Sequence, residues 1–147
     1  MKLPLLFSVL LSITTAVQAE DLFYLKCDYK SIASRRNLKT DQVTEESKTG
    51  ANYYKADIAN SRIQGSYDTE WRTVDIVNGT AIDQEYKSGK NKFKTTVSYL
   101  LDLIPPGNMS FVMSASSTEE SITIMTKGVC QKSDKASFER ASTSGDN

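Results

Sequence analysis

Few kinds of side chain in this sequence could do chemistry, and the missing kinds exclude several classes of site. Histidine is absent from the 147 residues, which excludes a Ser-His-Asp triad, a Cys-His dyad and a histidine-ligated zinc ion. Two cysteines are too few for a four-thiolate zinc or iron–sulfur site. The doublets Glu45-Glu46 and Glu119-Glu120 would point their carboxylates to opposite faces of a strand, whereas a glycosidase needs two carboxylates across one sugar. We therefore expect no catalytic residues, no metal ion and no cofactor.

Aromatic residues are the best candidates for ligand binding. Five tyrosines fall on the apolar faces of the strands expected below: Tyr29, Tyr54, Tyr67, Tyr86 and Tyr99. Buried phenols need hydrogen-bond partners, and a small amphipathic molecule inside a barrel could supply them. The competing interpretation is a filled core whose hydroxyls reach water, with the lone Trp71 plugging one end or anchoring a partner. These five tyrosines and Trp71 are the candidate ligand-binding residues.

The charges are balanced, with 18 basic and 18 acidic residues, so a nucleic-acid binder is not expected. One segment is nonetheless basic, with lysines at Lys87, Lys90, Lys92 and Lys94. We interpret it as the solvated face of a hairpin opposite Asp83 and Glu85, and binding of an anion is the alternative.

The segment Met1–Ala19 is typical of a cleaved secretory signal. It has a positive Lys2, an apolar Leu5–Ile13 and the small-residue site Val17-Gln18-Ala19, so cleavage is expected before Glu20. Its apolar run is shorter than the roughly 20 residues that span a bilayer, and no later run is long and apolar enough. The sequence therefore predicts a secreted or periplasmic protein without a membrane span.

Export would place the two cysteines in an oxidising compartment, where an even number of cysteines is typical of disulfides. The one pairing that the sequence allows is Cys27 with Cys130. Two free thiols are the alternative.

Alternation of apolar and polar residues predicts strands along most of the chain. The first expected strand is Leu22–Ile32, and its inward residues are Phe23, Leu25, Cys27 and Tyr29. Residues 34–50 are polar and predict a long loop, with either a short strand near Gln42–Glu46 or a helical turn inside it. Pro105-Pro106-Gly107 predicts a further loop.

Two expected turns set the register of the middle of the chain. A two-residue turn at Asn60-Ser61 places Ile58 opposite Ile63. A three-residue loop over 77–79 places Val74 opposite Ile82, and we prefer it to a two-residue turn at Asn78-Gly79, which would mix the faces.

Two further turns set the register of the later strands. A tip at Ser88-Gly89 places Asp83 opposite Lys94, and the inward residues are then Ile82, Tyr86, Phe93, Thr95, Val97 and Tyr99. A four-residue tip over 117–120 places Ala115 opposite Ile122, and counting by twos from there puts Cys130 on the inner face.

Without the doubtful Gln42–Glu46 piece, the count is eight antiparallel strands in hairpin order. This predicts an all-β, single up-and-down barrel over residues 20–132, and a β-sandwich is the alternative. Residues 133–147 are polar around Phe138, and we expect this tail to be disordered.

The signal, the strand meander and the closing disulfide resemble small exported barrels of the calycin type in architecture. A lipocalin would show Gly-x-Trp near its first strand, whereas Trp71 follows Thr69-Glu70 in mid-chain. The Tyr24-x-x-Cys27 opening and the Gly128-Val129-Cys130 ending also resemble small bacterial periplasmic barrels, some of which inhibit lysozyme. These two fragments cover only seven residues, so we assign no family.

The function expected from these observations is that of an exported, non-catalytic binding module for a small ligand or a partner surface. The alternative is a protein inhibitor of an extracellular or periplasmic hydrolase, acting through Leu103–Ser110 or through the hairpin 87–90. A tyrosine-lined cavity of about 300 Å³ or more would favour a ligand, and a filled barrel with a protruding loop would favour an inhibitor. Asn78 and Asn108 each begin an N-glycosylation sequon.

Overall fold

The computed structural model describes residues 22–88 and 94–144. They form an antiparallel sheet that is nearly closed into a barrel, together with one short helix. The strands are β1 (Phe23–Asn37), β2 (Val43–Asp57), β3 (Arg62–Gly65), β4 (Arg72–Thr73), β5 (Asp75–Val77), β6 (Thr80–Ser88), β7 (Lys94–Asp102), β8 (Gly107–Ser116) and β9 (Glu120–Lys132), and the helix is α1 (Lys135–Thr143).

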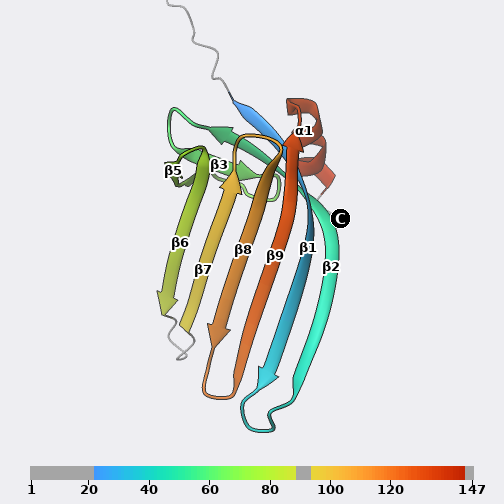
Figure 1. The fold of residues 1–147 in the computed structure, drawn as a ribbon, viewed down its shortest axis with the longest axis vertical. Helices are drawn as coiled ribbons and strands as arrows, with labels where there is room; N and C mark the ends of the chain where they lie inside the picture. The colour runs from blue at the N-terminus through green and yellow to red at the C-terminus, as the bar shows by residue number, and fades with distance from the viewer. Residues whose placement is uncertain (1–21, 89–93, 145–147) are drawn as a thin grey trace, which may run out of the picture.

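The sheet is closed at one end and open along the rest of one side. Its strand order is β4-β3-β2-β1-β9-β8-β7-β6-β5, and only Val74 separates β4 from β5 in the chain. The short strands β3, β4 and β5 lie at the upper end of the six long strands (Figure 1). There β3 pairs with 54–57 of β2, and β5 pairs with 80–82 of β6. Below them, within the described chain, 43–52 of β2 and 83–88 of β6 have a strand neighbour on one side only.

This fold confirms the predicted class, a single antiparallel up-and-down barrel with one disulfide. Over the described residues the strands are nine instead of eight, and they form one sheet instead of a sandwich. The predicted long loop over 34–50 is wrong, because β1 continues to Asn37 and β2 already begins at Val43. Side chains at this end of the sheet are exposed on both faces, so the sequence there carries no apolar alternation that would mark a strand.

The disulfide and the hairpin that leads to it are as predicted. Cys27 and Cys130 form a disulfide between directly opposed residues of β1 and β9, and both are fully buried. In the β8–β9 hairpin Ala115 lies opposite Ile122, and the strands continue in this register as far as Cys130. Leu25, Leu101 and Leu103 complete the most deeply buried part of the core, near the disulfide.

The turn after β2 is longer than predicted. Ala56 pairs with Ile63, so the expected pairing of Ile58 with Ile63 is wrong by two residues, and Ile58 lies in the turn with 40 % of its surface exposed. The Asp57 carboxylate causes the difference, because it accepts hydrogen bonds from the backbone and side chain of Asn60 and from Arg62. An even shift leaves the inward face of both strands unchanged.

At Asn78-Gly79 the predicted three-residue loop is also wrong. Val77 pairs with Thr80, which leaves a two-residue turn whose φ angles are 51° and 80°. Positive φ at both positions defines the type I′ turn, whose twist matches that of the flanking strands. This turn pairs a polar with an apolar residue, Asp75 with Ile82, but the ladder covers only the three residues of β5. Val74 is buried outside that ladder.

The predicted register between β6 and β7 is wrong by an odd number of residues, which reverses the expected face of β6 and leaves that of β7 as predicted. Asp83 lies opposite Tyr99 instead of Lys94, and Ala81 lies opposite Leu101. Ala81, Tyr99 and Leu101 are buried, so Ala81 and not Ile82 faces the core. Lys90, Lys92 and Phe93 lie outside the described residues, and Lys87 forms an exposed ion pair with Glu85.

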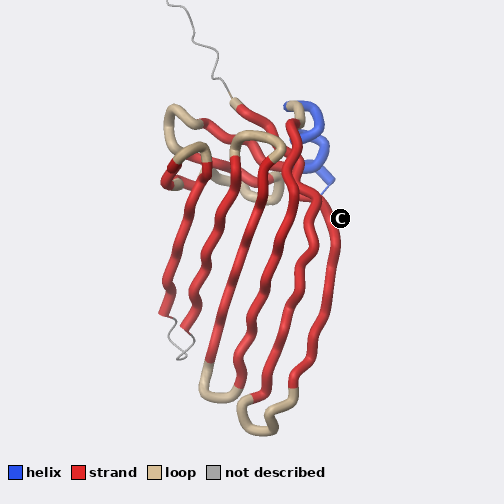
Figure 2. The backbone as a smooth tube through the Cα atoms, in the orientation of Figure 1, coloured by secondary structure: helices blue, strands red, loops and turns tan. Residues whose placement is uncertain are grey.

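The tail expected to be disordered contains α1 instead. Asp134 caps its N-terminus by accepting a hydrogen bond from the backbone N–H of Ser137 at 2.8 Å. Phe138, 6 % exposed, packs edge-on against Tyr24 with ring centroids 6.0 Å apart. The helix therefore lies against the same end of the sheet as the short strands (Figure 2). The expected signal, Met1–Ala19, lies outside the described residues.

Candidate functional site

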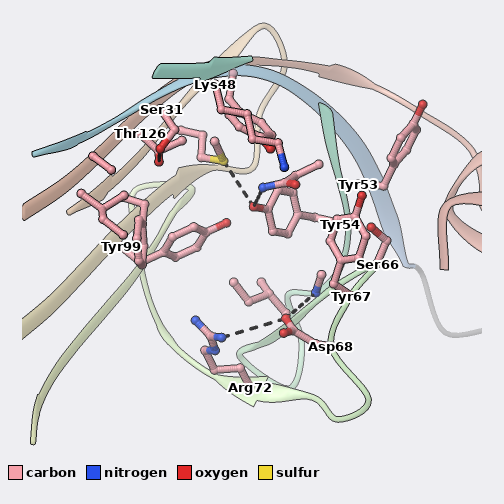
Figure 3. A pocket seen from close by; sticks show the side chains of 18 of the residues that line it. Ser31, Lys48, Tyr53, Tyr54, Ser66, Tyr67, Asp68, Arg72, Tyr99 and Thr126 are labelled. Atoms are coloured by element: carbon pink, nitrogen blue, oxygen red, sulfur yellow. Dashed lines mark hydrogen bonds and ion pairs between the residues drawn. The ribbon is translucent and has the colours of Figure 1, made fainter. Parts of the chain in front are cut away.

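A cavity of about 520 Å³ lies on the concave face of the sheet, below the disulfide-bonded core. It receives side chains from β1, β2, β3, β4, β7, β8 and β9, and from the loop between β3 and β4 (Figure 3). Its lining residues are Tyr29, Ser31, Ala33, Glu46, Ser47, Lys48, Asn52, Tyr53, Tyr54, Ile63, Gly65, Ser66, Tyr67, Asp68, Arg72, Tyr99, Met109, Phe111, Ile124 and Thr126.

The floor of the cavity is built by strand alternation across neighbouring strands. One row of directly opposed residues runs across five strands, namely Lys48, Ser31, Thr126, Phe111 and Tyr99. The next row toward the open end begins Glu46, Ala33, Ile124. Because opposed residues in an antiparallel ladder share a face, all these side chains meet on the concave side.

The loop after β3 covers one end of this cavity and is fixed by Asp68. Its carboxylate accepts a hydrogen bond from the Gly65 backbone N–H at 3.0 Å, and the Gln64 side chain donates to the Asp68 carbonyl oxygen at 2.7 Å. The Arg72 guanidinium lies 4.0 Å from the Asp68 carboxylate and 3.6 Å from Asp83 on β6. Arg72 thus links this loop to the opposite edge of the sheet.

Tyr54 projects into the middle of the cavity. Its hydroxyl accepts a hydrogen bond from the Asn52 amide at 3.1 Å and donates to the Met109 sulfur at 3.3 Å (Figure 3). Burial raises the pKa of the Tyr54 phenol above its ordinary value. Tyr54 is therefore a neutral and fully partnered group at neutral pH.

Tyr99 differs from Tyr54 because its hydroxyl has no partner. The residue is 5 % exposed, its ring lies 6.1 Å from that of Tyr54, and its hydroxyl makes no hydrogen bond with any described residue. Burial, followed by the electrostatic interaction with the neighbouring Tyr54, raises the pKa of Tyr99 well above its ordinary value. The Ser66 hydroxyl is likewise buried and unpartnered. Two polar groups of the cavity wall thus have hydrogen bonds still to make.

Tyr29 lies against a glycine. A Cβ atom on Gly50, which faces Tyr29 across the ladder, would come within 2.7 Å of the Tyr29 hydroxyl and 2.9 Å of the ring carbon that carries it. Gly50 therefore leaves the Tyr29 ring room to lie flat along the concave face.

The structure brings together four of the six candidate residues, Tyr29, Tyr54, Tyr67 and Tyr99. Tyr86 pairs with Thr96 in the ladder, and its side chain is not among those described. Trp71 does not line this cavity, because it lies in an adjoining depression. The Arg62 guanidinium is 4.5 Å and the Lys55 ammonium 4.7 Å from the centre of its ring.

Sequence reasoning missed the polar residues Lys48, Asn52, Ser66 and Arg72. Lys48 lies in the segment taken for a loop, and Arg72 lies in a two-residue strand. The period-two spacing of Glu46, Lys48 and Asn52 is the signal that would have placed them on one face of β2.

In the part of the chain that the structure describes, no three acidic or cysteine side chains come together to hold a metal ion, and no helix is long and apolar enough to cross a membrane. No protein-family model, curated protein or solved structure matches the chain.

Proposed function

We propose that the protein binds a small amphipathic molecule in the cavity on its concave face, without acting on it chemically. The observation that carries this proposal is the buried Tyr99 hydroxyl, which lies unpartnered beside a cavity of about 520 Å³. An unmade hydrogen bond of a buried hydroxyl costs about 1–3 kcal/mol. The hydroxyl itself has almost no exposed surface, so a ligand oxygen that displaces the side chains around it would recover that free energy.

The rest of the lining fits a molecule with one apolar and one polar part. Met109, Phe111 and Ile124 offer apolar surface on three neighbouring positions of β8 and β9. In the same part of the wall the Thr126 hydroxyl donates a hydrogen bond to the Ser31 hydroxyl oxygen at 2.8 Å. Small-ligand sites are typically of this kind, mostly apolar with a few polar groups that fix the orientation.

The uncharged fluorescent probe N-phenyl-1-naphthylamine tests this proposal. We expect its fluorescence to rise on binding to the wild-type protein and to stay low with Ile124→Trp, because the larger side chain fills the cavity. Met125→Trp is the matched control, since Met125 is the next residue of β9 and 47 % exposed on the convex face. Equal binding by the two variants would contradict the proposed site.

A second candidate function, inhibition of an extracellular hydrolase, has one observation in its favour. Ile104 is 70 % exposed in the β7–β8 loop, although Leu103 beside it is buried. Asp102 fixes the base of this loop by accepting hydrogen bonds from Thr80 and from the Asn108 backbone. A rigid loop with an exposed apolar tip is suited to insertion into an enzyme cleft.

Lysozyme digestion of a peptidoglycan suspension tests this second candidate. We expect micromolar wild-type protein to slow the digestion and Ile104→Asp to do so less. No inhibition by the wild-type protein would exclude lysozyme as the target.

We also propose that the protein is exported and loses residues 1–19. The Cys27–Cys130 disulfide supports this, because disulfides persist in oxidising compartments. The full chain is to be expressed in a bacterial host with an intact secretion system. A mature protein that begins at Glu20 is the expected mass-spectrometric result, and an uncleaved chain would contradict it.

A further inference from the structure

We propose that the ligand is an organic anion, a carboxylate with an apolar body, whose charge is neutralised by Lys48. This inference rests on the proposed function and names the ligand class of the same cavity.

Lys48 is the cation of the cavity wall that has no partner. It lies opposite Ser31 in the row of side chains that ends at Tyr99, and its ammonium group points into the cavity toward Tyr54 (Figure 3). It forms no ion pair or hydrogen bond with any residue of the described ranges. Lys48 is exposed, so water can reach its ammonium group, and an anionic oxygen is the partner that three donors and no acceptor favour.

The other charged groups of the cavity are less suited than Lys48 to neutralise the charge of a bound anion. Arg72 lies between Asp68 and Asp83, so its charge is already offset. Asp68 is occupied by the Gly65 backbone N–H. Glu46 is two residues from Lys48 on the same face of β2, where its charge opposes that of a bound anion.

Tyr99 adds a second group that suits an anion. Its raised pKa keeps the phenol neutral, so at neutral pH the hydroxyl is a donor without an acceptor. Hydrogen bonds to an ionised acceptor are roughly twice as strong as those between neutral groups. The row between Lys48 and Tyr99 contains Ser31, Thr126 and Phe111. Phe111 is the apolar surface of this row on which the apolar body of the ligand can pack.

Displacement of N-phenyl-1-naphthylamine by decanoate and by decan-1-ol at neutral pH tests the inference. The two competitors share a chain length and differ in charge. We expect Lys48→Gln to weaken decanoate binding about tenfold, the size of one charge-assisted hydrogen bond, and to change decanol binding less than twofold. Glu46→Gln is expected to strengthen decanoate binding by a few fold, because it removes a like charge.

Lys30→Gln is the matched control. Lys30 precedes Ser31 on β1, is exposed on the convex face and does not line the cavity, so both competitors should bind this variant as they bind the wild type. Raising the salt concentration provides a measurement that needs no variant. It should weaken decanoate binding to the wild-type protein and leave decanol binding unchanged.

The outcomes separate the two proposals. A probe that does not bind the wild-type protein overturns the proposed function. A probe that binds and is displaced equally by both competitors in wild type and Lys48→Gln overturns only the anion inference. A salt-independent decanoate affinity would overturn it as well.

Discussion

Tyr99 is the residue at which stability and binding are expected to oppose each other. Its hydroxyl is buried without a partner, so Tyr99→Phe removes an unsatisfied polar group. We predict that the free energy of unfolding rises by about 1 kcal/mol and that decanoate binding weakens. Urea denaturation and probe displacement measure the two effects.

Tyr54→Phe is the informative comparison for this prediction. The Tyr54 hydroxyl has two partners, Asn52 and Met109, so removing it should lower the stability. A Tyr99→Phe protein less stable than the wild type would show that the Tyr99 hydroxyl is satisfied in solution.

Asp57 is expected to make the stability depend on pH. Hydrogen bonds from Asn60, and from Arg62, whose guanidinium is 2.7 Å from the carboxylate, hold the pKa of Asp57 below its ordinary value. A carboxylate with a lowered folded-state pKa stabilises the protein above its unfolded pKa of about 3.9, and this contribution is lost as the pH falls through the folded value. The stability difference between wild type and Asp57→Asn should therefore be largest at neutral pH and shrink below pH of about 4.

Urea denaturation from pH 7 down to pH 2.5 checks this dependence. Asp75→Asn is the control, because Asp75 is exposed in β5 and its side chain has no partner among residues 22–88 and 94–144. An Asp57→Asn difference that is constant with pH would contradict the role given to the Asn60 and Arg62 hydrogen bonds.

Residue types predicted the tyrosines of the cavity better than its charged groups. Tyr29, Tyr54 and Tyr99 could be found because strand parity alone decides which side an aromatic residue faces. Lys48 was missed because its segment was predicted as a loop, and Arg72 could not be found because only the ladder partners decide the face of a two-residue strand.

At the scale of secondary structure, α1 is expected to depend on a single side chain. Phe138 is its one buried residue, packed on Tyr24 and beneath the Lys55 ammonium. A helix of nine residues is marginal by itself in water. We predict that Phe138→Ala lowers the free energy of unfolding by about 3 kcal/mol and removes amide protection throughout α1.

Hydrogen exchange with mass spectrometry, together with urea denaturation, tests this prediction. Glu139→Ala is the control, because Glu139 is exposed and pairs only with the exposed Lys135. Such a pair contributes less than about 1 kcal/mol. Protection of α1 that survives Phe138→Ala would show that other contacts hold the helix.

Prediction of the strand registers succeeded where large apolar residues mark the buried face and failed where they do not. The β8–β9 register was predictable because Met113, Ala115, Ile122 and Ile124 alternate with polar residues on both sides of a polar turn. In β6, by contrast, the alternation Ile82, Tyr86 favoured the wrong face, and the small Ala81 opposite Leu101 faces the core. Local hydrophobicity cannot identify a small residue required by close packing.

The missed helix had one signal, the capping residue Asp134.

At the scale of the whole molecule, the disulfide is expected to supply much of the stability. It joins residues 103 apart in sequence, and closing a loop of that length is worth about 4–5 kcal/mol in the chain-entropy model. We predict that the double variant Cys27→Ala/Cys130→Ala loses up to that amount in urea denaturation and keeps the β1–β9 pairing. Two titratable thiols in the denatured wild-type protein would contradict the crosslink itself.

The covalent order of the nine strands has a further consequence. The first and last strands, β1 and β9, are neighbours in the middle of the sheet, whereas β4 and β5, adjacent in the chain, form its two outer borders. A circular permutant, fused across β9 and β1 and reopened at Val74, would therefore run from one border of the sheet to the other without a single out-of-order step. No loop connects β1 to β9, which pair in the middle of the sheet. The disulfide between Cys27 and Cys130 is therefore the covalent link between these two neighbouring strands.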